Sequence, residues 1–223
     1  MILSAHQPNY LPWIGYFHKM KTSDMFVVFD NVQYMKGSFT NRTQLFIRDL
    51  QYYLTVSVNS HLGQKINEVT IDKHFQLKKH LDTIFFLYGK SPNFFLFWDE
   101  FKKIYSKSYS RLYDLNYELI LLIRSILNIK TEMLLLSDIG VAGRKSELLI
   151  NICKKNGADT YLSGNGAKAY MQDDLFFKNN ISVAYQSFIH PEYPQKSDRF
   201  IKGLSIIDFI FNCEDYMSIF NSL

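Results

Sequence analysis

The start of the chain alternates between apolar stretches and polar turns in a way that constrains the fold strongly. Residues 2–5 predict a short strand, residues 13–20 a short helix, and residues 25–29 a buried strand. Pro8 and Pro12 restrict the backbone between the first strand and the helix. This order is one βαβ unit, whose two strands are expected to run parallel with a right-handed crossover.

Polar side chains follow both strands of this unit. The residues after the first strand are His6, Gln7, Asn9 and Tyr10, and those after the second are Asp30, Asn31 and Gln33. Because ligands of open α/β sheets bind at the carboxyl ends of the strands, we expect these two segments to line one crevice.

The rest of the chain adds strands and helices in a mixed order. Strands are expected at 44–47, 52–56, 68–71, 132–136, 160–162 and 181–185, with a hairpin turn at 48–51. Helical spacing covers 74–88, 92–106, 110–127, 145–155 and 205–220. The predicted fold class is α/β, with a Rossmann-like, mixed and mainly parallel sheet flanked by helices. We expect a single domain over 1–223, with a helical block at about 74–127.

Composition narrows the classes of partner. The net charge is only +4, and the lysines are scattered among acidic residues, so we expect no nucleic-acid partner and favour an anionic small molecule. Cys153 and Cys213 each lie in an apolar helical pattern, which predicts two buried free thiols. No apolar run is long enough to cross a bilayer and no signal peptide is evident, so we expect a cytoplasmic protein.

Two side chains after the first strands are candidates for acid–base chemistry. The His6 imidazole titrates near neutral pH and could act as a base, or it could bond neighbouring backbone and fix the turn. Asp30 could act on a hydroxyl, an amine or a metal ion, or lie in a solvated loop. The six histidines show no zinc-ligand spacing, so we expect no metal site.

Other turns hold candidates for ligand contacts. The glycines of residues 163–166, Ser-Gly-Asn-Gly, would let backbone N–H groups approach a phosphate or carboxylate, and a plain tight turn is the alternative. Arg42 could grip a phosphate or carboxylate with two hydrogen bonds, or form a surface ion pair. Tyr193 and Gln195 lie in a loop that prolines restrict.

Several of these segments taken together resemble the WbqC-like family over nearly the whole chain. The matching segments are His6-Gln7-Pro8-Asn9-Tyr10-Leu11-Pro12-Trp13-Ile14-Gly15-Tyr16-Phe17, Asp30-Asn31-Val32-Gln33, Asn41-Arg42, Tyr161-Leu162-Ser163-Gly164, Tyr193-Pro194-Gln195 and Leu204-Ser205-Ile206-Ile207-Asp208. Members of that family are associated with bacterial surface-polysaccharide gene clusters, and a glycine transferase role has been suggested for one branch. The resemblance therefore implies modification of O-antigen or capsule sugars.

The resemblance also implies a set of functional positions. They are His6, Gln7, Asn9, Tyr10, Asp30, Gln33, Arg42, Ser163, Gly164, Tyr170, Tyr193, Gln195 and Asp208. A more distant resemblance is to nucleotidylyltransferases and pantothenate synthetase, in which the turn before the first helix carries a His-x-Gly-His signature. Trp13 and Tyr16 stand at the two histidine positions here, which puts nucleotidyl transfer by the usual histidines in doubt.

The leading hypothesis is an enzyme that transfers an acyl or aminoacyl group, such as glycine, to the amine of a nucleotide-linked amino sugar. Either His6 or Asp30 would be the base. Asn9, Gln7 and the Gly164 backbone would donate to the oxyanion. Gln33 and Ser163 are further expected substrate contacts, Arg42 would hold a pyrophosphate or carboxylate, and Tyr10, Tyr170 and Tyr193 would stack on a base or sugar.

Two alternatives stand beside this hypothesis. One is a nucleotidyl-transfer or adenylate-forming enzyme of Rossmann-like fold, and the other is a non-catalytic subunit that binds nucleotide sugars. The sequence leaves the cofactor open, and the candidates are ATP and an activated acyl or aminoacyl donor. The acceptor sugar and the oligomeric state are left open by the sequence.

Overall fold

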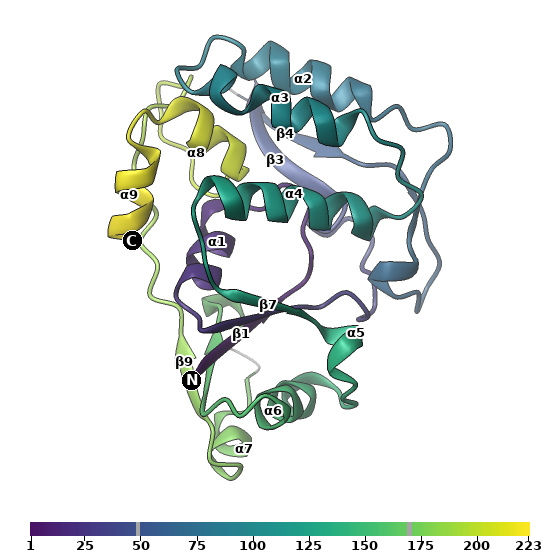
Figure 1. Cartoon of the computed structure of the whole chain (residues 1–223), viewed down its shortest axis with the longest axis vertical. Helices are drawn as coiled ribbons and strands as arrows, with labels where there is room; N and C mark the ends of the chain where they lie inside the picture. Colours follow the sequence, from purple (N-terminus) through teal and green to yellow (C-terminus); the bar gives the residue numbers. More distant parts are fainter. Residues whose placement is uncertain (48–49, 169–170) are drawn as a thin grey trace.

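The computed structural model describes residues 1–47, 50–168 and 171–223. Within these ranges, the centre of the fold is one five-stranded sheet in the order β7-β2-β1-β8-β9 (Figure 1). Its strands are β1 (Ile2–His6), β2 (Met25–Val28), β7 (Glu132–Leu135), β8 (Thr160–Ser163) and β9 (Ser182–Tyr185). Every neighbouring pair is parallel. The strand order therefore reverses between β1 and β8, which is the switch point where doubly wound sheets bind ligands.

Helices cover both faces of this sheet (Figure 1). On one face lie α1 (Ile14–Lys21) and α4 (Leu112–Ile126), and on the other lie α5 (Leu136–Ile139), α6 (Lys145–Lys155) and α7 (Asp173–Phe177). Successive side chains of a strand point to opposite faces. Phe26 and Val28 of β2 therefore belong to the first core, and Met25 and Val27 belong to the second.

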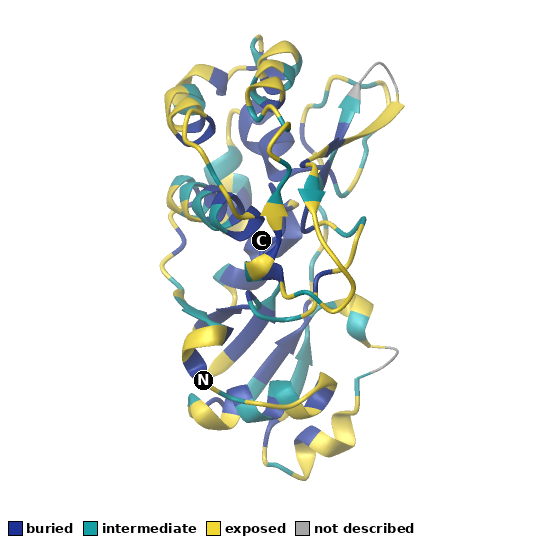
Figure 2. Cartoon of the chain, turned by 90° about the vertical axis from the view of Figure 1, so that its right-hand side faces the viewer, coloured by how far each residue is buried: buried dark blue, intermediate teal, exposed yellow. Residues whose placement is uncertain are grey.

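A long insertion separates β2 from β7. It contains the hairpin β3 (Arg42–Ile47) and β4 (Leu50–Thr55), the pair β5 (Val58–Asn59) and β6 (Thr70–Ile71), the short helix η1 (Ile66–Glu68), and the helices α2 (Lys78–Tyr88), α3 (Phe94–Tyr105) and α4. The helices α8 (Ile206–Asn212) and α9 (Tyr216–Ser222) return to this part of the molecule. Buried residues run from the sheet into the helical block (Figure 2), because one apolar cluster joins them.

The predicted α/β class is confirmed, and so is the parallel βαβ unit at the start of the chain. The two cysteines are free and buried, as predicted. The antiparallel strands differ from the prediction, because β3 with β4 and β5 with β6 form separate two-stranded sheets. The hairpin forms, although residues 48 and 49 of its predicted turn lie outside the described residues.

Local details also differ from the prediction. Residues 66–68 form a 3₁₀ turn, so only 70–71 of the expected strand at 68–71 are extended. The expected helix at 205–220 is interrupted between Asn212 and Tyr216. The Asn93 amide donates to the carbonyl of Cys213 at 2.6 Å and to that of Ile210 at 3.1 Å, which fixes the break. In the part of the chain that the structure covers, no helix is long and apolar enough to span a bilayer.

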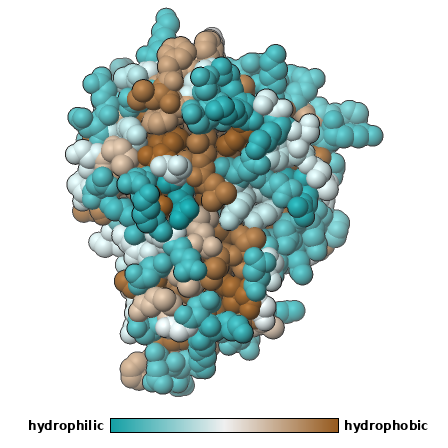
Figure 3. Space-filling model, viewed as in Figure 1, coloured by the Kyte–Doolittle hydropathy of each residue, from teal (hydrophilic) through white to brown (hydrophobic). Residues whose placement is uncertain are grey.

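The helical block exposes an apolar surface. Figure 3 shows apolar side chains in the upper half of the molecule, which contains α2 and α3, and others lower down. The large apolar side chains most exposed on these two helices are Phe85, Phe86, Phe95 and Leu96. These four side chains therefore give the helical block an exposed apolar surface of its own.

Asp208 ties the C-terminal part of the chain to the helical block. Its buried carboxylate accepts hydrogen bonds from the hydroxyls of Tyr88 at 3.0 Å and Tyr193 at 2.9 Å. The amides of Gln195 and Asn212 each donate to it at 3.2 Å. Burial raises the pKa of Asp208. Four donors from α2, α8 and the 193–195 loop therefore depend on one carboxylate.

Replacement of this carboxylate should destabilise the fold. Asp208→Ala leaves buried donors without an acceptor, and each unsatisfied group costs about 1–3 kcal/mol. We expect the free energy of unfolding, measured by chemical denaturation, to fall by at least about 3 kcal/mol. The control Asp198→Ala removes an exposed carboxylate and should stay within about 0.5 kcal/mol of the original protein. A loss below 1 kcal/mol for Asp208→Ala, on the order of a surface change, would contradict this role.

Candidate active site

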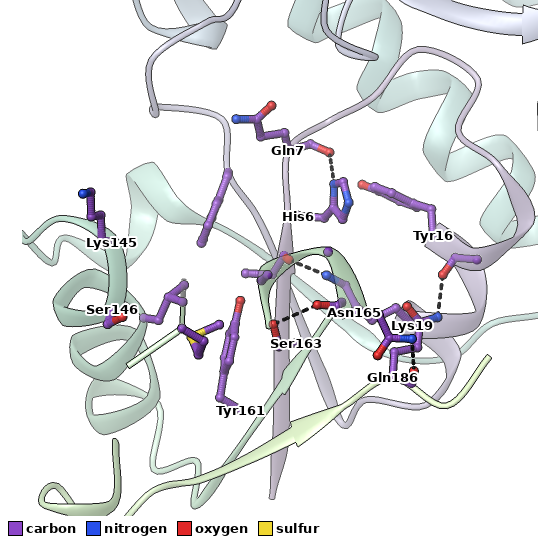
Figure 4. Close-up of a pocket in the computed structure, with 18 of the residues that line it drawn as sticks. His6, Gln7, Tyr16, Lys19, Lys145, Ser146, Tyr161, Ser163, Asn165 and Gln186 are labelled. Atoms are coloured by element: carbon purple, nitrogen blue, oxygen red, sulfur yellow. Dashed lines mark hydrogen bonds between the residues drawn. The ribbon is translucent and has the colours of Figure 1, made fainter. Parts of the chain in front are cut away.

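A cavity of about 970 Å³ lies at the carboxyl ends of β1 and β8. Its walls come from the segment between β1 and α1, the loop after β8, the start of α6 and the segment after β9 (Figure 4). Ligand pockets in proteins span roughly 300–1,000 Å³, so the cavity is large enough for a nucleotide-sized molecule. The site therefore occupies the switch point that the strand order defines.

His6, the last residue of β1, lines this cavity as a neutral side chain. Its Nδ1 lies 3.2 Å from the carbonyl oxygen of Gln7, and its ring meets the Tyr16 ring edge-on at 4.8 Å between centroids. A carbonyl only accepts, so the neutral ring carries its proton on Nδ1 and leaves a lone pair on Nε2. Burial, with a smaller contribution from the Lys19 charge, lowers the pKa of His6 to about 3. His6 is therefore unprotonated at neutral pH.

Lys19 of α1 brings a buried cation to the same cavity. Its side chain is 5% exposed, and its Nζ donates to the Ala5 carbonyl at 2.8 Å. Among the described residues, no carboxylate lies within 4.0 Å of this Nζ. Burial lowers the pKa of Lys19 to about 8. At neutral pH the cavity therefore holds a positive charge that lacks a counter-ion.

The loop after β8 leaves open space at the cavity wall. Gly164 has φ −72° and starts the 3₁₀ turn η2 (Asn165–Ala167). A Cβ atom placed on Gly164 or Gly166 would meet nothing within 4 Å, and neither glycine has a positive φ. Protein packing therefore does not require either glycine. Their lack of side chains keeps the cavity open for a ligand that approaches the backbone.

Aromatic side chains form one edge of the cavity. Trp13 meets the ring of Phe188 edge-on at 5.3 Å between centroids. The indole lies so close to Gly15 that a Cβ there would be 2.4 Å from its ring atoms. Gln186, which also lines the cavity, donates to the Gly15 carbonyl at 2.8 Å. Gly15 therefore allows Trp13 to lie flat against the start of α1.

Four of the residues expected from the sequence line this cavity: His6, Gln7, Ser163 and Gly164. Gln7 accepts a hydrogen bond from the Thr40 hydroxyl at 3.3 Å through its Oε1, which leaves its amide N–H groups available. Phe29 and Val32, on either side of Asp30 in the chain, line the cavity too. The segments after β1 and β2 therefore do share one crevice.

Asp30 itself does not line the cavity with them. It is 2% exposed, and its carboxylate accepts from the Ser137 backbone N–H at 3.0 Å and the Asn67 amide at 3.1 Å. The expectation that the polar residues after the first two strands line one crevice needs correction for Asp30. A buried carboxylate needs donors, and Asp30 finds them at the start of α5 and in η1.

The remaining expected contacts lie away from the cavity lining. Tyr10 is fully buried, and its hydroxyl lies 2.8 Å from His80 and 2.5 Å from Tyr105. The guanidinium of Arg42 lies 4.3 Å from the centre of the Tyr53 ring. Asn9 is buried, Gln33 is exposed, Tyr193 and Gln195 bind Asp208, and Tyr170 lies outside the described residues. Substrate contact by these residues stays a prediction.

Lys19, Trp13 and Gln186 were not expected at the site from the sequence. For Lys19 a signal was present, because residues four apart lie on one face of a helix. Gly15 and Lys19 have this spacing in the first predicted helix, directly after the polar turn. Nothing in the sequence around Gln186 places it against α1, because that contact joins residues 171 positions apart.

Together, the doubly wound parallel sheet and the large cavity at its switch point define a Rossmann-like α/β protein. Residues 7–218 match the WbqC-like protein family, and the chain belongs to this family. It is also 31% identical over 210 residues to a Mycobacterium tuberculosis (strain H37Rv) protein called "Uncharacterized protein Rv1507c", covering 92% of this chain and 91% of that protein. The resemblance seen in the sequence is confirmed, and family membership indicates a role related to polysaccharide biosynthesis.

The buried charge of Lys19 should lower the stability of the protein at neutral pH. Its pKa is about 8 in the folded protein against 10.5 for a free side chain, so the unfolded chain binds more protons between these pH values. Stability therefore rises with pH through this window. The difference corresponds to about 3 kcal/mol of destabilisation below pH 8.

Lys19→Met should therefore increase the free energy of unfolding at pH 7. Because the variant also loses the bond to the Ala5 carbonyl, we expect a net gain of about 1–2 kcal/mol. The cost of the buried charge falls by about 2 kcal/mol between pH 7 and pH 9.5, where the original lysine is already neutral when folded, so the gain should disappear at pH 9.5. Lys21→Met is the matched control on α1, because Lys21 donates to the carbonyls of Phe220 and Asn221 and its loss should destabilise. Denaturation at the two pH values tests this, and a loss of stability in Lys19→Met at both would contradict it.

Proposed function

We propose that this protein transfers an acyl or aminoacyl group, such as glycine, from an activated donor to the amine of a nucleotide-linked amino sugar. The reaction would serve the biosynthesis of a surface polysaccharide such as O-antigen or capsule. The observation that carries the proposal is a neutral His6 on the wall of a 970 Å³ cavity, beside the buried cation of Lys19. The polysaccharide-related role of the family supports the choice of a sugar substrate.

The chemistry requires a proton acceptor and donors for a developing negative charge. The sugar amine attacks the carbonyl carbon of the donor, and the His6 Nε2 takes the proton that the amine releases. The carbonyl oxygen becomes an oxyanion, which the Gln7 amide and the Gly164 N–H would stabilise. The bond to the leaving group then breaks, and the proton passes from His6 to that group. The donor is an activated carboxylic acid, so the transfer itself consumes no ATP.

His6 is placed for this role because it lines the cavity and its Nε2 has no hydrogen-bond partner among the described residues. To take the proton, its pKa has to rise from about 3 when the substrate binds. Burial and the nearby Lys19 charge both disfavour the imidazolium. An anionic substrate against Lys19 would offset the second effect and would make proton uptake by His6 easier. Because nucleotide-linked sugars are cytoplasmic metabolites, the proposal keeps the predicted cytoplasmic location.

Asp30 was the alternative base in the sequence analysis, and we assign it a positioning role. Its two carboxylate oxygens already accept from Ser137 and Asn67, so it holds the start of α5 against the end of β2. Its neighbours Phe29 and Val32 line the cavity, and loss of Asp30 would therefore disturb the wall without removing the base.

The assay mixes purified protein with nucleotide-activated amino sugars and activated glycine donors, and mass spectrometry detects the glycyl adduct on the sugar. We expect His6→Asn to lower the transfer rate by about 10²- to 10⁴-fold with an unchanged fold, because a proton acceptor is lost. Asp30→Asn tests the alternative base and should lower the rate much less than His6→Asn, because it disturbs the wall without removing the proton acceptor. His74→Asn, at an exposed histidine outside the cavity lining, is the matched control and should keep the rate. No product across the panel counts against acyl transfer, and an unaffected His6→Asn removes His6 from the mechanism.

A second candidate function is nucleotidyl transfer or adenylate-forming ligation. The strand order β7-β2-β1-β8-β9 favours it, because sheets of this winding bind nucleotides at the switch point. Release of pyrophosphate that depends on ATP and Mg²⁺ would support this reaction over acyl transfer. Ligand binding without any turnover, together with co-purification of a glycosyltransferase, would instead support a binding subunit.

A further inference from the structure

We propose that Lys19 binds the diphosphate group of a nucleotide-linked substrate, at the place where β1 and β8 meet. The inference rests on the proposed function only in placing the substrate in this cavity. It names the chemical class of the ligand and the residue that selects it. Lys19 was not a candidate in the sequence, and its role follows from its position in the fold.

The position of Lys19 is that of a ligand-binding cation. Its Nζ uses one donor on the Ala5 carbonyl, which leaves two N–H groups free for another acceptor. In the close-up, Lys19 lies near Ser163 and Asn165 at the lower right of the cavity, and Lys145 and Ser146 lie across it (Figure 4). Lys19 is therefore the buried cation of this wall, and Lys145 is an exposed cation on the opposite side.

A purely structural role does not account for this lysine. A buried ammonium without a carboxylate destabilises the fold, because desolvation favours the neutral form. A methionine would fill similar space without that cost. A bound anion would form the ion pair that the Lys19 ammonium lacks in the free protein. Ligand binding therefore explains why a lysine is present at this buried position.

The surrounding loop favours a diphosphate over a small carboxylate. Ser163, Gly164 and Gly166 line the same cavity as Lys19, and the two glycines leave the backbone open to a ligand. Backbone N–H groups of glycine-containing turns together with a lysine are a common arrangement for phosphate groups. The cavity volume of about 970 Å³ is far larger than an isolated acetate would need and leaves room for the nucleoside and the sugar.

Binding can be measured directly by titration calorimetry with uridine, guanosine and thymidine diphosphates as probes. The matching uncharged nucleosides report contacts that do not involve phosphate. We expect at least one diphosphate to bind more tightly than its nucleoside, and Lys19→Met to weaken that diphosphate by about 10- to 100-fold. Affinity for the nucleoside should stay unchanged in Lys19→Met. Lys21→Met, the matched control on the same helix, should bind the diphosphate like the original protein.

Proton uptake gives a second readout that a structural lysine would not produce. A bound anion raises the pKa of Lys19, so binding at pH 8.5 should take up a fraction of a proton. The other titratable or charged groups on the cavity wall are His6, Tyr16, Lys145 and Tyr161. Lys19→Arg distinguishes proton uptake by Lys19 from uptake by these other groups, because arginine keeps the charge and does not titrate in this range. The uptake, measured in buffers of different ionisation enthalpy, should disappear in Lys19→Arg, while the preference for diphosphate over nucleoside remains.

The outcomes separate this inference from the proposed function. The role of Lys19 would be overturned if none of the three diphosphates bound, or if Lys19→Met bound them as tightly as the original protein does. It would also be overturned if acetate competed for the site and no diphosphate did. Acyl transfer that continues unchanged in Lys19→Met would leave the function standing and reject the inference. Diphosphate binding that depends on Lys19, with no transfer product from any donor, would support the inference and reject acyl transfer.

Discussion

The pairing of β1 with β2 on one side and β8 on the other organises the molecule. Because all three strands are parallel, their carboxyl ends meet at one edge of the sheet, and the connections leave this edge in opposite directions. The cavity lies at the carboxyl ends of β1 and β8, where these connections diverge. The long insertion after β2 can then grow into a helical block without disturbing this edge, since it packs on one face through a shared apolar core.

The electrostatics of the cavity follow from this arrangement. α1 runs back over β1 and brings Lys19 to the Ala5 carbonyl, where burial removes much of the hydration of the ammonium. The same burial keeps the neighbouring His6 neutral. A fixed positive charge beside a neutral imidazole suits a site that binds an anion and takes a proton from a neutral group. In our proposal, a bound anion recovers the stability that the fold gives up here.

The candidate site could be predicted in part from the sequence. His6, Gln7, Ser163 and Gly164 were expected at the strand ends, and all four line the cavity. Tyr10 came from the same polar turn, yet its hydroxyl bonds with His80 and Tyr105 inside the core. Side chains of one turn can point to the cavity or away from it. Which of them does so depends on helices that arrive from about 70 to 95 residues later in the chain.

The sequence by itself determined the βαβ start, the helical block, the α/β class and the family, because these depend on local periodicity, turn residues and motifs. Only the tertiary structure decided that Asp30 turns into the protein and that Lys19 faces the cavity. Both outcomes depend on contacts made by folding: Ser137 and Asn67 bind the carboxylate, the Ala5 carbonyl binds the ammonium, and residues of β8 line the same cavity. A charged side chain takes its role from the donors, acceptors and solvent around it, and folding alone brings these together.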